Sequence, residues 1–274
     1  MVRPASEPEG IVLFDVADSI ATLTLNNPEK LNPMTPAMRH ALVELLRMAD
    51  DDTRVRAVVI TGAGRGFCAG ADVTALRQRA DGEGQEPPPG LAHAASADLS
   101  QTFAWTISRM AKPVVAAING PAVGLGFGLA MSCDLRVAAE DARIGARFPR
   151  LGVSAEEASS YLLPRMIGLA RALDVLLSGR LMSGREAHEL GLVDRVAPAG
   201  QALSAARALA GELAENSPLA VAVIKHQVYG GLESTMEQQL HRELTATREL
   251  LKSRDHAEGI RSFMEKRQPR FEGR

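Results

Sequence analysis

Hydrophobic positions in the first half of the chain alternate between short β-type runs and amphipathic helical stretches. Residues 20–25 alternate apolar and polar side chains with a period of two, and together with residues 11–14 they predict a hairpin. Residues 54–61 and 114–118 contain continuously apolar cores, which are typical of strands buried on both faces. Between residues 25 and 54, Thr35 predicts the start of a helix that extends to about residue 48, with a proline at its first position. This order of elements predicts an α/β fold.

The second half of the chain is predominantly helical in pattern. A helix is predicted at 99–110, before the strand at 114–118. After strands at 135–139 and 142–145, helices are predicted from near Ala155 and then at 171–178, 184–190 and 201–216. From Pro218 onward almost every residue fits a helix, and the apolar stripe of these helices is thin. We therefore predict a core over residues 1–200 and a helical oligomerisation region over residues 201–274.

Two strands end in glycine-rich turns that lead into helices. Residues 114–134 read VVAAINGPAVGLGFGLAMSCD, and residues 55–61 are followed by the loop 62–70 and a short predicted helix at 72–79. A helix that begins at such a turn presents unpaired backbone N–H groups and a partial positive charge. We expect the two turns to direct two N–H groups at one carbonyl oxygen, as in an oxyanion hole.

The loop at 62–66 is similar to a dinucleotide-binding fingerprint but does not match it. The GxGxxG pattern that starts at Gly62 requires a third glycine at the position of Phe67. A nucleotide-binding fold of that kind is therefore not favoured.

Composition narrows the class of protein. The 274 residues carry a formal charge of −2, which does not favour general nucleic-acid binding. Two cysteines, Cys68 and Cys133, are expected to be buried and reduced, and no Cys or His cluster indicates a metal site. With neither an apolar signal-peptide core nor a membrane-spanning run in the sequence, we expect a cytoplasmic protein with no membrane partner.

Residues 80–97 form a loose stretch with three consecutive prolines. Such a segment can be a lid or access loop near a ligand, or a surface loop without a role. Both interpretations remain open.

Glu156 and Glu157 are the two carboxylates that we consider as candidate catalytic groups. They are predicted in the first turn of a helix, just after the apolar Leu151-Gly152-Val153. Acidic residues there often only complement the helix dipole. The functional alternative makes one of them a general base in an apolar pocket, with its pKa raised by burial.

The motifs 67–72 (FCAGAD), 119–126 (NGPAVGLG), 129–134 (LAMSCD), 179–193 and 263–267 together resemble the crotonase, or enoyl-CoA hydratase/isomerase, superfamily. The resemblance spans nearly the whole chain in the expected order. It implies a crotonase-like ββα spiral core, a C-terminal helical trimerisation region, homotrimers or hexamers, and an acyl-CoA thioester substrate. It places the two oxyanion donors on the backbone N–H groups of Ala71 and Leu125, and it implies no metal and no cofactor beyond the coenzyme A of the substrate.

The chain departs from the hydratase pattern at two positions. Hydratases of this family resemble one another in two glutamates that activate water, and the corresponding positions here carry Gly128 and Phe148. Some isomerases of the family instead place one acid where this chain has Glu156. We therefore favour Δ3-Δ2 enoyl-CoA isomerisation over hydration, with Glu157 as the alternative base, and a dehalogenase-like reaction with an Asp nucleophile is disfavoured. A non-catalytic acyl-CoA-binding protein is the alternative from another class.

The resemblance also implies residues that contact the substrate. Lys30 falls in the loop that wraps the pantetheine and adenine, while Phe263 and Lys266 fall where relatives reach the nucleotide, often across a subunit boundary. The remaining predicted contacts with the acyl thioester are those at Ala69, Asp72, Gly124 and Phe148.

Overall fold

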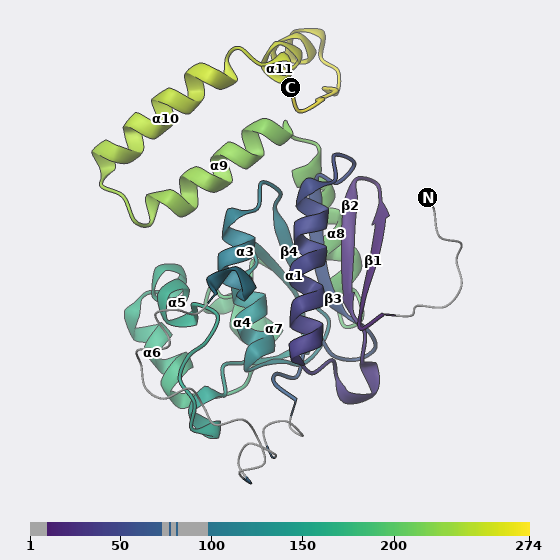
Figure 1. Cartoon of the computed structure of the whole chain (residues 1–274), viewed down its shortest axis with the longest axis vertical. Coiled ribbons are helices and arrows are strands. Elements are labelled where there is room, and N and C mark those ends of the chain that lie inside the picture. The colour runs from purple at the N-terminus through teal and green to yellow at the C-terminus, as the bar shows by residue number, and fades with distance from the viewer. Residues whose placement is uncertain (1–9, 73–76, 78–80, 82–97) are drawn as a thin grey trace.

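The computed structural model describes residues 10–72, 77, 81 and 98–274. The helix predicted over 72–79 and the loop predicted over 80–97 therefore lie almost entirely outside the described residues. The remainder is a mixed α/β structure, as predicted (Figure 1).

A six-stranded sheet forms the centre, in the order β1-β2-β3-β4-β6-β9. Only β1 and β2 are antiparallel, and this hairpin confirms the prediction for the N-terminal strands. The following pairs are all parallel. The strands are β1 Val12–Ala17, β2 Ile20–Leu25, β3 Ala57–Gly62, β4 Val114–Ile118, β6 Leu135–Ala139 and β9 Arg195–Ala197. A smaller sheet consists of β5 Ala122–Val123, β7 Arg143–Gly145 and β8 Met182–Ser183.

Helices cover both faces of the large sheet, because alternate side chains of each strand point to opposite faces. Val58 and Ile60 of β3 belong to the larger core, which is covered by α1 Pro36–Asp51, α3 Phe103–Arg109 and α4 Leu125–Ser132. Val59 belongs to a second core under α8 Ala202–Ala214. The first helix after residue 200 thus packs on the sheet.

The beginning of α1 follows the predicted signal. The Thr35 hydroxyl accepts a hydrogen bond from the Met38 N–H at 3.1 Å, and Pro36 occupies the first turn. Its buried face includes Met38, Leu42 and Leu46, so the apolar spacing also sets which side faces the sheet.

The other connections carry short helices. These are η1 Pro28–Lys30, η3 Leu99–Gln101, η4 Phe148–Leu151, α5 Ser159–Ile167, α6 Leu169–Ser178 and α7 Gly184–Glu189. The helix predicted over 99–110 is divided into η3 and α3. The prediction of a helix from near Ala155 is wrong at its start, because α5 begins at Ser159 and leaves both glutamates in the preceding turn.

Three C-terminal helices form a separate layer at one end of the molecule: α9 Pro218–Gly231, α10 Met236–Leu250 and α11 Arg254–Glu265 (Figure 1). Their attachment involves Asp134, the residue that ends the central glycine-rich stretch. Its carboxylate accepts hydrogen bonds from the Val114 N–H at 2.7 Å and from Tyr229 at 2.8 Å, and it pairs with Lys225 at 2.6 Å. Asp134 therefore has a structural role, which is to join β4 to α9.

Candidate active site

The two glycine-rich turns lie in contact. Gly70 has a φ of +103° and Gly124 a φ of +55°, both in the region that favours glycine. A Cβ atom added to Gly70 would lie 2.9 Å from the Val123 carbonyl oxygen and 3.8 Å from the Leu125 nitrogen. One added to Gly124 would lie 3.9 Å from the Cα of Gly70. The residues after these glycines, Ala71 and Leu125, are therefore neighbours across the two turns.

Neighbouring strands and loops hold both turns in place. Cys68 and Ala122 form a bridge in which the Val123 N–H donates to the Cys68 carbonyl at 3.0 Å. The Gly70 carbonyl accepts from the Met34 N–H at 2.7 Å. Within the described part of the chain, neither the Ala71 N–H nor the Leu125 N–H donates to a protein acceptor. Both groups are thus available for the predicted role, and their convergence on one oxygen stays a prediction.

The structure separates the environments of the two candidate carboxylates. Glu157 is buried and its side chain pairs with Arg39, while its second oxygen accepts a hydrogen bond from the Phe103 N–H at 2.8 Å. Glu156 is exposed to solvent. Burial, which we expect of a general base, is thus found at Glu157 and not at Glu156.

Gly128 and Phe148 occupy the two positions where the hydratase pattern has glutamates. Both residues are buried. A Cβ atom added to Gly128 would lie 2.9 Å from the Cβ and 3.0 Å from the Cγ of Glu157. The side chain of Glu157 therefore fills the space beside Gly128.

Other predicted site residues are divided between distant parts of the chain. Ala69 and Asp72 flank Gly70 on the loop already described, and the Ala69 N–H donates to the Leu31 carbonyl at 2.9 Å. Lys30 is exposed on η1, which lies in the part of the molecule that contains the large sheet. Phe263 and Lys266 are exposed at the end of α11, in the opposite layer (Figure 1). A single chain does not bring these two residues to Lys30.

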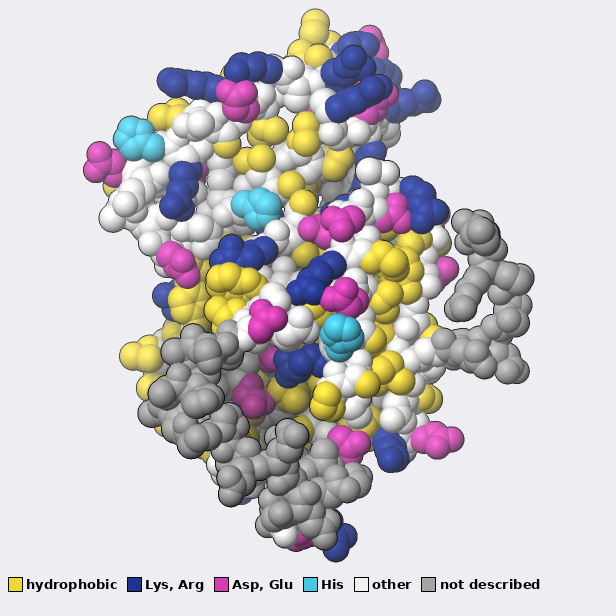
Figure 2. Space-filling view, viewed as in Figure 1, with side chains coloured by type: hydrophobic (Ala, Val, Ile, Leu, Met, Phe, Trp, Pro, Cys, Tyr) yellow, Lys and Arg dark blue, Asp and Glu magenta, His cyan; other side chains and the backbone are white. Residues whose placement is uncertain are grey.

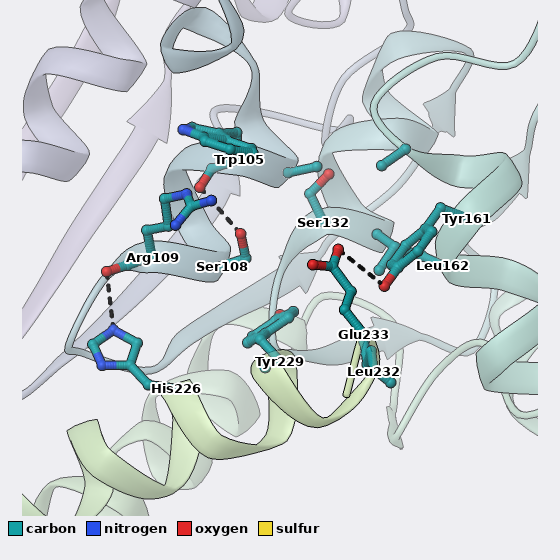
Figure 3. Close-up of a pocket in the computed structure, with 13 residues that line it drawn as sticks. Trp105, Ser108, Arg109, Ser132, Tyr161, Leu162, His226, Tyr229, Leu232 and Glu233 are labelled. Carbon is teal, nitrogen blue, oxygen red and sulfur yellow. Dashed lines mark hydrogen bonds between the residues drawn. The ribbon is translucent and has the colours of Figure 1, made fainter. Parts of the chain in front are cut away.

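A cavity of about 590 Å³ opens between α3, α5 and α9. It has aromatic walls formed by Trp105, Tyr161 and Tyr229, and Glu233 lies across from Tyr161 (Figure 3). The Tyr161 hydroxyl and a Glu233 carboxylate oxygen are 3.5 Å apart. Ser132 and Ala158 also line the cavity, so it lies beyond the C-terminal end of α4 and next to the turn that carries Glu157.

Sequence reasoning did not identify this cavity or the partners of Glu157. The residues that line the cavity come from four helices and the turns beside them, and Arg39 lies 118 positions before Glu157. An arginine on a predicted helix is most often a solvated surface charge, so nothing near Arg39 indicated a buried pair. The only local signal was the small residue at 128, which could have indicated that another side chain packs there.

Burial affects the reactivity of both cysteines. Desolvation raises the pKa of the Cys68 thiol to about 11, and it raises the pKa of the Cys133 thiol to about 12. Both thiols are buried, as predicted, and burial makes them poor nucleophiles.

Comparison with known proteins finds matches over nearly the whole chain. The family described as enoyl-CoA hydratase/isomerase matches residues 15–274. A protein of Thermus thermophilus, provisionally named an enoyl-CoA hydratase, is 40% identical over 92% of this chain and 97% of its own length. The 1,2-epoxyphenylacetyl-CoA isomerase of Escherichia coli is 34% identical over 96% of this chain and 98% of its own. The crystal structure of an enoyl-CoA hydratase from Polaromonas sp. JS666 has a TM-score of 0.86 and 34% identity, and covers 95% of this chain and 99% of that one.

Proposed function

Because this chain belongs to the enoyl-CoA hydratase/isomerase family, we propose that it is an isomerase that converts 3-enoyl-CoA to 2-enoyl-CoA thioesters, with Glu156 as its single acid and base. The observation that carries this proposal is the environment of Gly128. A hydratase needs an acid and a base around a water molecule. Here the space beside Gly128 is filled by Glu157, whose two oxygens already accept from Arg39 and Phe103.

The reaction needs only one carboxylate and two N–H donors. The thioester oxygen accepts hydrogen bonds from Ala71 and Leu125, which stabilise negative charge on that oxygen. Glu156 removes a proton from C2, and the electron pair of that C–H bond forms a dienolate with the C3–C4 double bond. The same carboxylic acid then returns the proton to C4, which leaves the double bond between C2 and C3.

Glu156 is the better candidate of the two neighbours for this transfer. Both oxygens of Glu157 are already engaged, one by the Arg39 guanidinium and one by the Phe103 N–H. Glu156 is accessible from solvent and therefore to a ligand. An acyl chain bound over it would desolvate the carboxylate, and desolvation favours uptake of a proton.

Direct assay tests the proposal. Incubation with 3-enoyl-CoA should produce the absorbance of a conjugated thioester, and Glu156→Gln should lower that rate by about 10²-fold or more while acyl-CoA affinity stays nearly unchanged. Glu157→Gln is the matched comparison, because it changes the adjacent side chain in the same way and should lower the rate clearly less. Loss of turnover in Glu157→Gln alone would identify Glu157 as the base.

Hydration is the second candidate, supported by the names of the Thermus and Polaromonas proteins. It predicts that 2-enoyl-CoA loses its conjugated absorbance. A non-catalytic acyl-CoA-binding protein is the third candidate, and it predicts binding of both thioesters without any spectral change. Repeating the assay with acyl chains of different length would define the substrate range.

The nucleotide end of coenzyme A is proposed to contact Lys30 from one subunit and Phe263 and Lys266 from another. This arrangement requires a second subunit, and the proposed assembly is a homotrimer or a hexamer. It is supported by the distance between η1 and α11 in one chain (Figure 1) and by the hydrophobic side chains exposed on the C-terminal layer, among the charged ones (Figure 2).

Among the helices in the described part of the chain, none combines the length and the apolar character that a membrane-spanning helix needs. A cytoplasmic location and the lack of a cofactor remain predictions.

A further inference from the structure

The pair formed by Arg39 and Glu157 joins three segments that are distant in sequence. Arg39 lies on α1, Glu157 lies in the turn before α5, and the Phe103 N–H that binds the same carboxylate is the first of α3. The Glu157 side chain is only 3% exposed, whereas that of Arg39 is 25% exposed. The Arg39 guanidinium also lies over the Phe103 ring, 4.7 Å from its centre. A buried carboxylate needs such partners, because an unpaired charge there is strongly destabilising.

The turn that carries both glutamates has an unfavourable backbone conformation. Glu157 and Ala158 have φ values of 51° and 54°, in the left-handed region that residues with a Cβ atom rarely adopt. Such a conformation persists only where surrounding contacts determine it. The contacts of the Glu157 carboxylate with Arg39 and the Phe103 N–H are the first set of contacts that hold this turn.

Hydrogen bonds to the backbone carbonyls of the turn are the second set. The Glu156 carbonyl accepts from the Ser159 N–H at 3.1 Å and from the Ser159 hydroxyl at 2.6 Å. The Ser132 hydroxyl lies 3.4 Å from the Glu157 carbonyl. The backbone of Glu156 is thus fixed between a buried ion pair and the beginning of α5.

Glu157 also limits what position 128 can carry. The added Cβ at Gly128 would lie 2.9 Å from the Cβ of Glu157, closer than real Cβ atoms approach, and 3.0 Å from its Cγ. The conflict involves the Cβ atom of Glu157, so a change of its rotamer cannot remove it. Position 128 therefore excludes a glutamate as long as Glu157 is in this turn.

We propose that Arg39 is a positioning residue, which acts through Glu157 to hold Glu156 in place for proton transfer, and that Glu157 keeps position 128 free of a hydratase carboxylate. The first part rests on the proposed isomerase function. The second part is steric and stands independently of it. Neither Arg39 nor Glu157 takes part in proton transfer itself.

Kinetics of Arg39 variants test the first part. Arg39→Met should lower kcat for 3-enoyl-CoA isomerisation by about 10-fold or more, with KM changed by less than about 2-fold, because alignment of the base is lost and substrate contacts are kept. Arg39→Lys should recover most of that loss, since a lysine restores the charge opposite Glu157. Glu157→Gln should also cost kcat, but clearly less than Glu156→Gln.

Three results would overturn the positioning role. These are a normal kcat in Arg39→Met, an effect of that variant on KM alone, or a loss in Glu157→Gln equal to that in Glu156→Gln. The last result would mean that Glu157 contributes to the reaction as directly as Glu156 does, and it leaves the isomerase function intact. A wild type that does not isomerise 3-enoyl-CoA removes the proposed function and the positioning role together.

A double-mutant cycle of unfolding tests the steric part without any activity measurement. Gly128→Ala should lower the denaturation midpoint of the wild type. In a Glu157→Gly background it should have no such effect, because glycine removes the conflicting Cβ and accepts the left-handed φ. An equal loss from Gly128→Ala in both backgrounds would show that Glu157 does not restrict position 128.

Discussion

The backbone of Gly70 lies so close to Val123 that a methyl group added to Gly70 would stand 2.9 Å from the Val123 carbonyl oxygen. This contact brings the first glycine turn against the second. It explains why a side chain at position 70 is excluded twice, by space and by a φ of +103°. The availability of the Ala71 and Leu125 N–H groups depends on it.

Gly70→Ala should therefore lower isomerase activity by about 10²-fold or more, because it separates the two proposed oxyanion donors. It should also destabilise the fold by about 1–3 kcal/mol through backbone strain. Gly200→Ala is the matched control, since Gly200 has a similarly positive φ of 76° but nothing within 4 Å of an added Cβ. Steady-state kinetics and urea unfolding of both variants separate the two effects. Equal activity in both would argue against the oxyanion assignment.

The glycine turns could be found from sequence because glycine and proline carry local backbone information. The same is true of the Thr35 cap, whose hydroxyl bonds the Met38 N–H as its position predicts. The turn at Glu157 and Ala158 could not be found in this way. Neither residue favours a left-handed conformation, and the contacts that impose it come from residues far along the chain.

The partners of buried charged residues could not be predicted from the sequence either. The carboxylate of Asp134 accepts from the Val114 N–H. Its pairing with Lys225 joins positions 91 residues apart, and no local pattern specifies that the one lysine of α9 turns inward.

Lys225→Met tests whether this buried pair secures the C-terminal layer. Lys225 is 7% and Asp134 15% exposed at the side chain, so removal of the ammonium leaves a buried carboxylate without its charge partner. We expect a loss of about 3 kcal/mol or more in the free energy of unfolding, measured by urea titration. Lys252→Met, which breaks an exposed pair with Glu249, should cost less than about 0.5 kcal/mol. Similar losses in the two variants would contradict a special role for the buried pair.

The two thiols predict a pH dependence of stability. Burial raises the pKa of Cys68 to about 11 and that of Cys133 to about 12, above the ordinary value of 9.0. Between pH 9 and these values the unfolded chain loses thiol protons that the folded chain keeps, so ionisation favours unfolding. Each thiol should lower stability by up to about 1.4 kcal/mol per pH unit over that range.

Cys68→Ala provides the comparison for this thiol prediction. The variant should show a shallower decline of unfolding free energy with rising pH than the wild type. Alkylation at pH 8 should likewise be slow for both thiols of the folded protein and fast in denaturant. Rapid labelling of the folded protein would contradict the burial of these side chains.

Assembly is tested on α10, where Met236, Leu240 and Leu244 recur every four residues and are 81%, 50% and 57% exposed. This spacing places them along one face of the helix, and a continuous apolar face of this kind is typical of a protein–protein interface. Light scattering at micromolar concentration should give the mass of a trimer or hexamer for the wild type. Leu244→Asp should shift the mass toward a monomer, because it places a charge in that face, whereas Thr245→Asp on another face of α10 should not.

If Phe263 and Lys266 reach coenzyme A from a neighbouring subunit, Leu244→Asp should also raise KM for acyl-CoA. The same variant should leave KM unchanged for an acyl-pantetheine thioester that lacks the nucleotide. A wild type that is monomeric, or a dissociated variant with the same KM for acyl-CoA, would mean that each chain binds the nucleotide with its own residues.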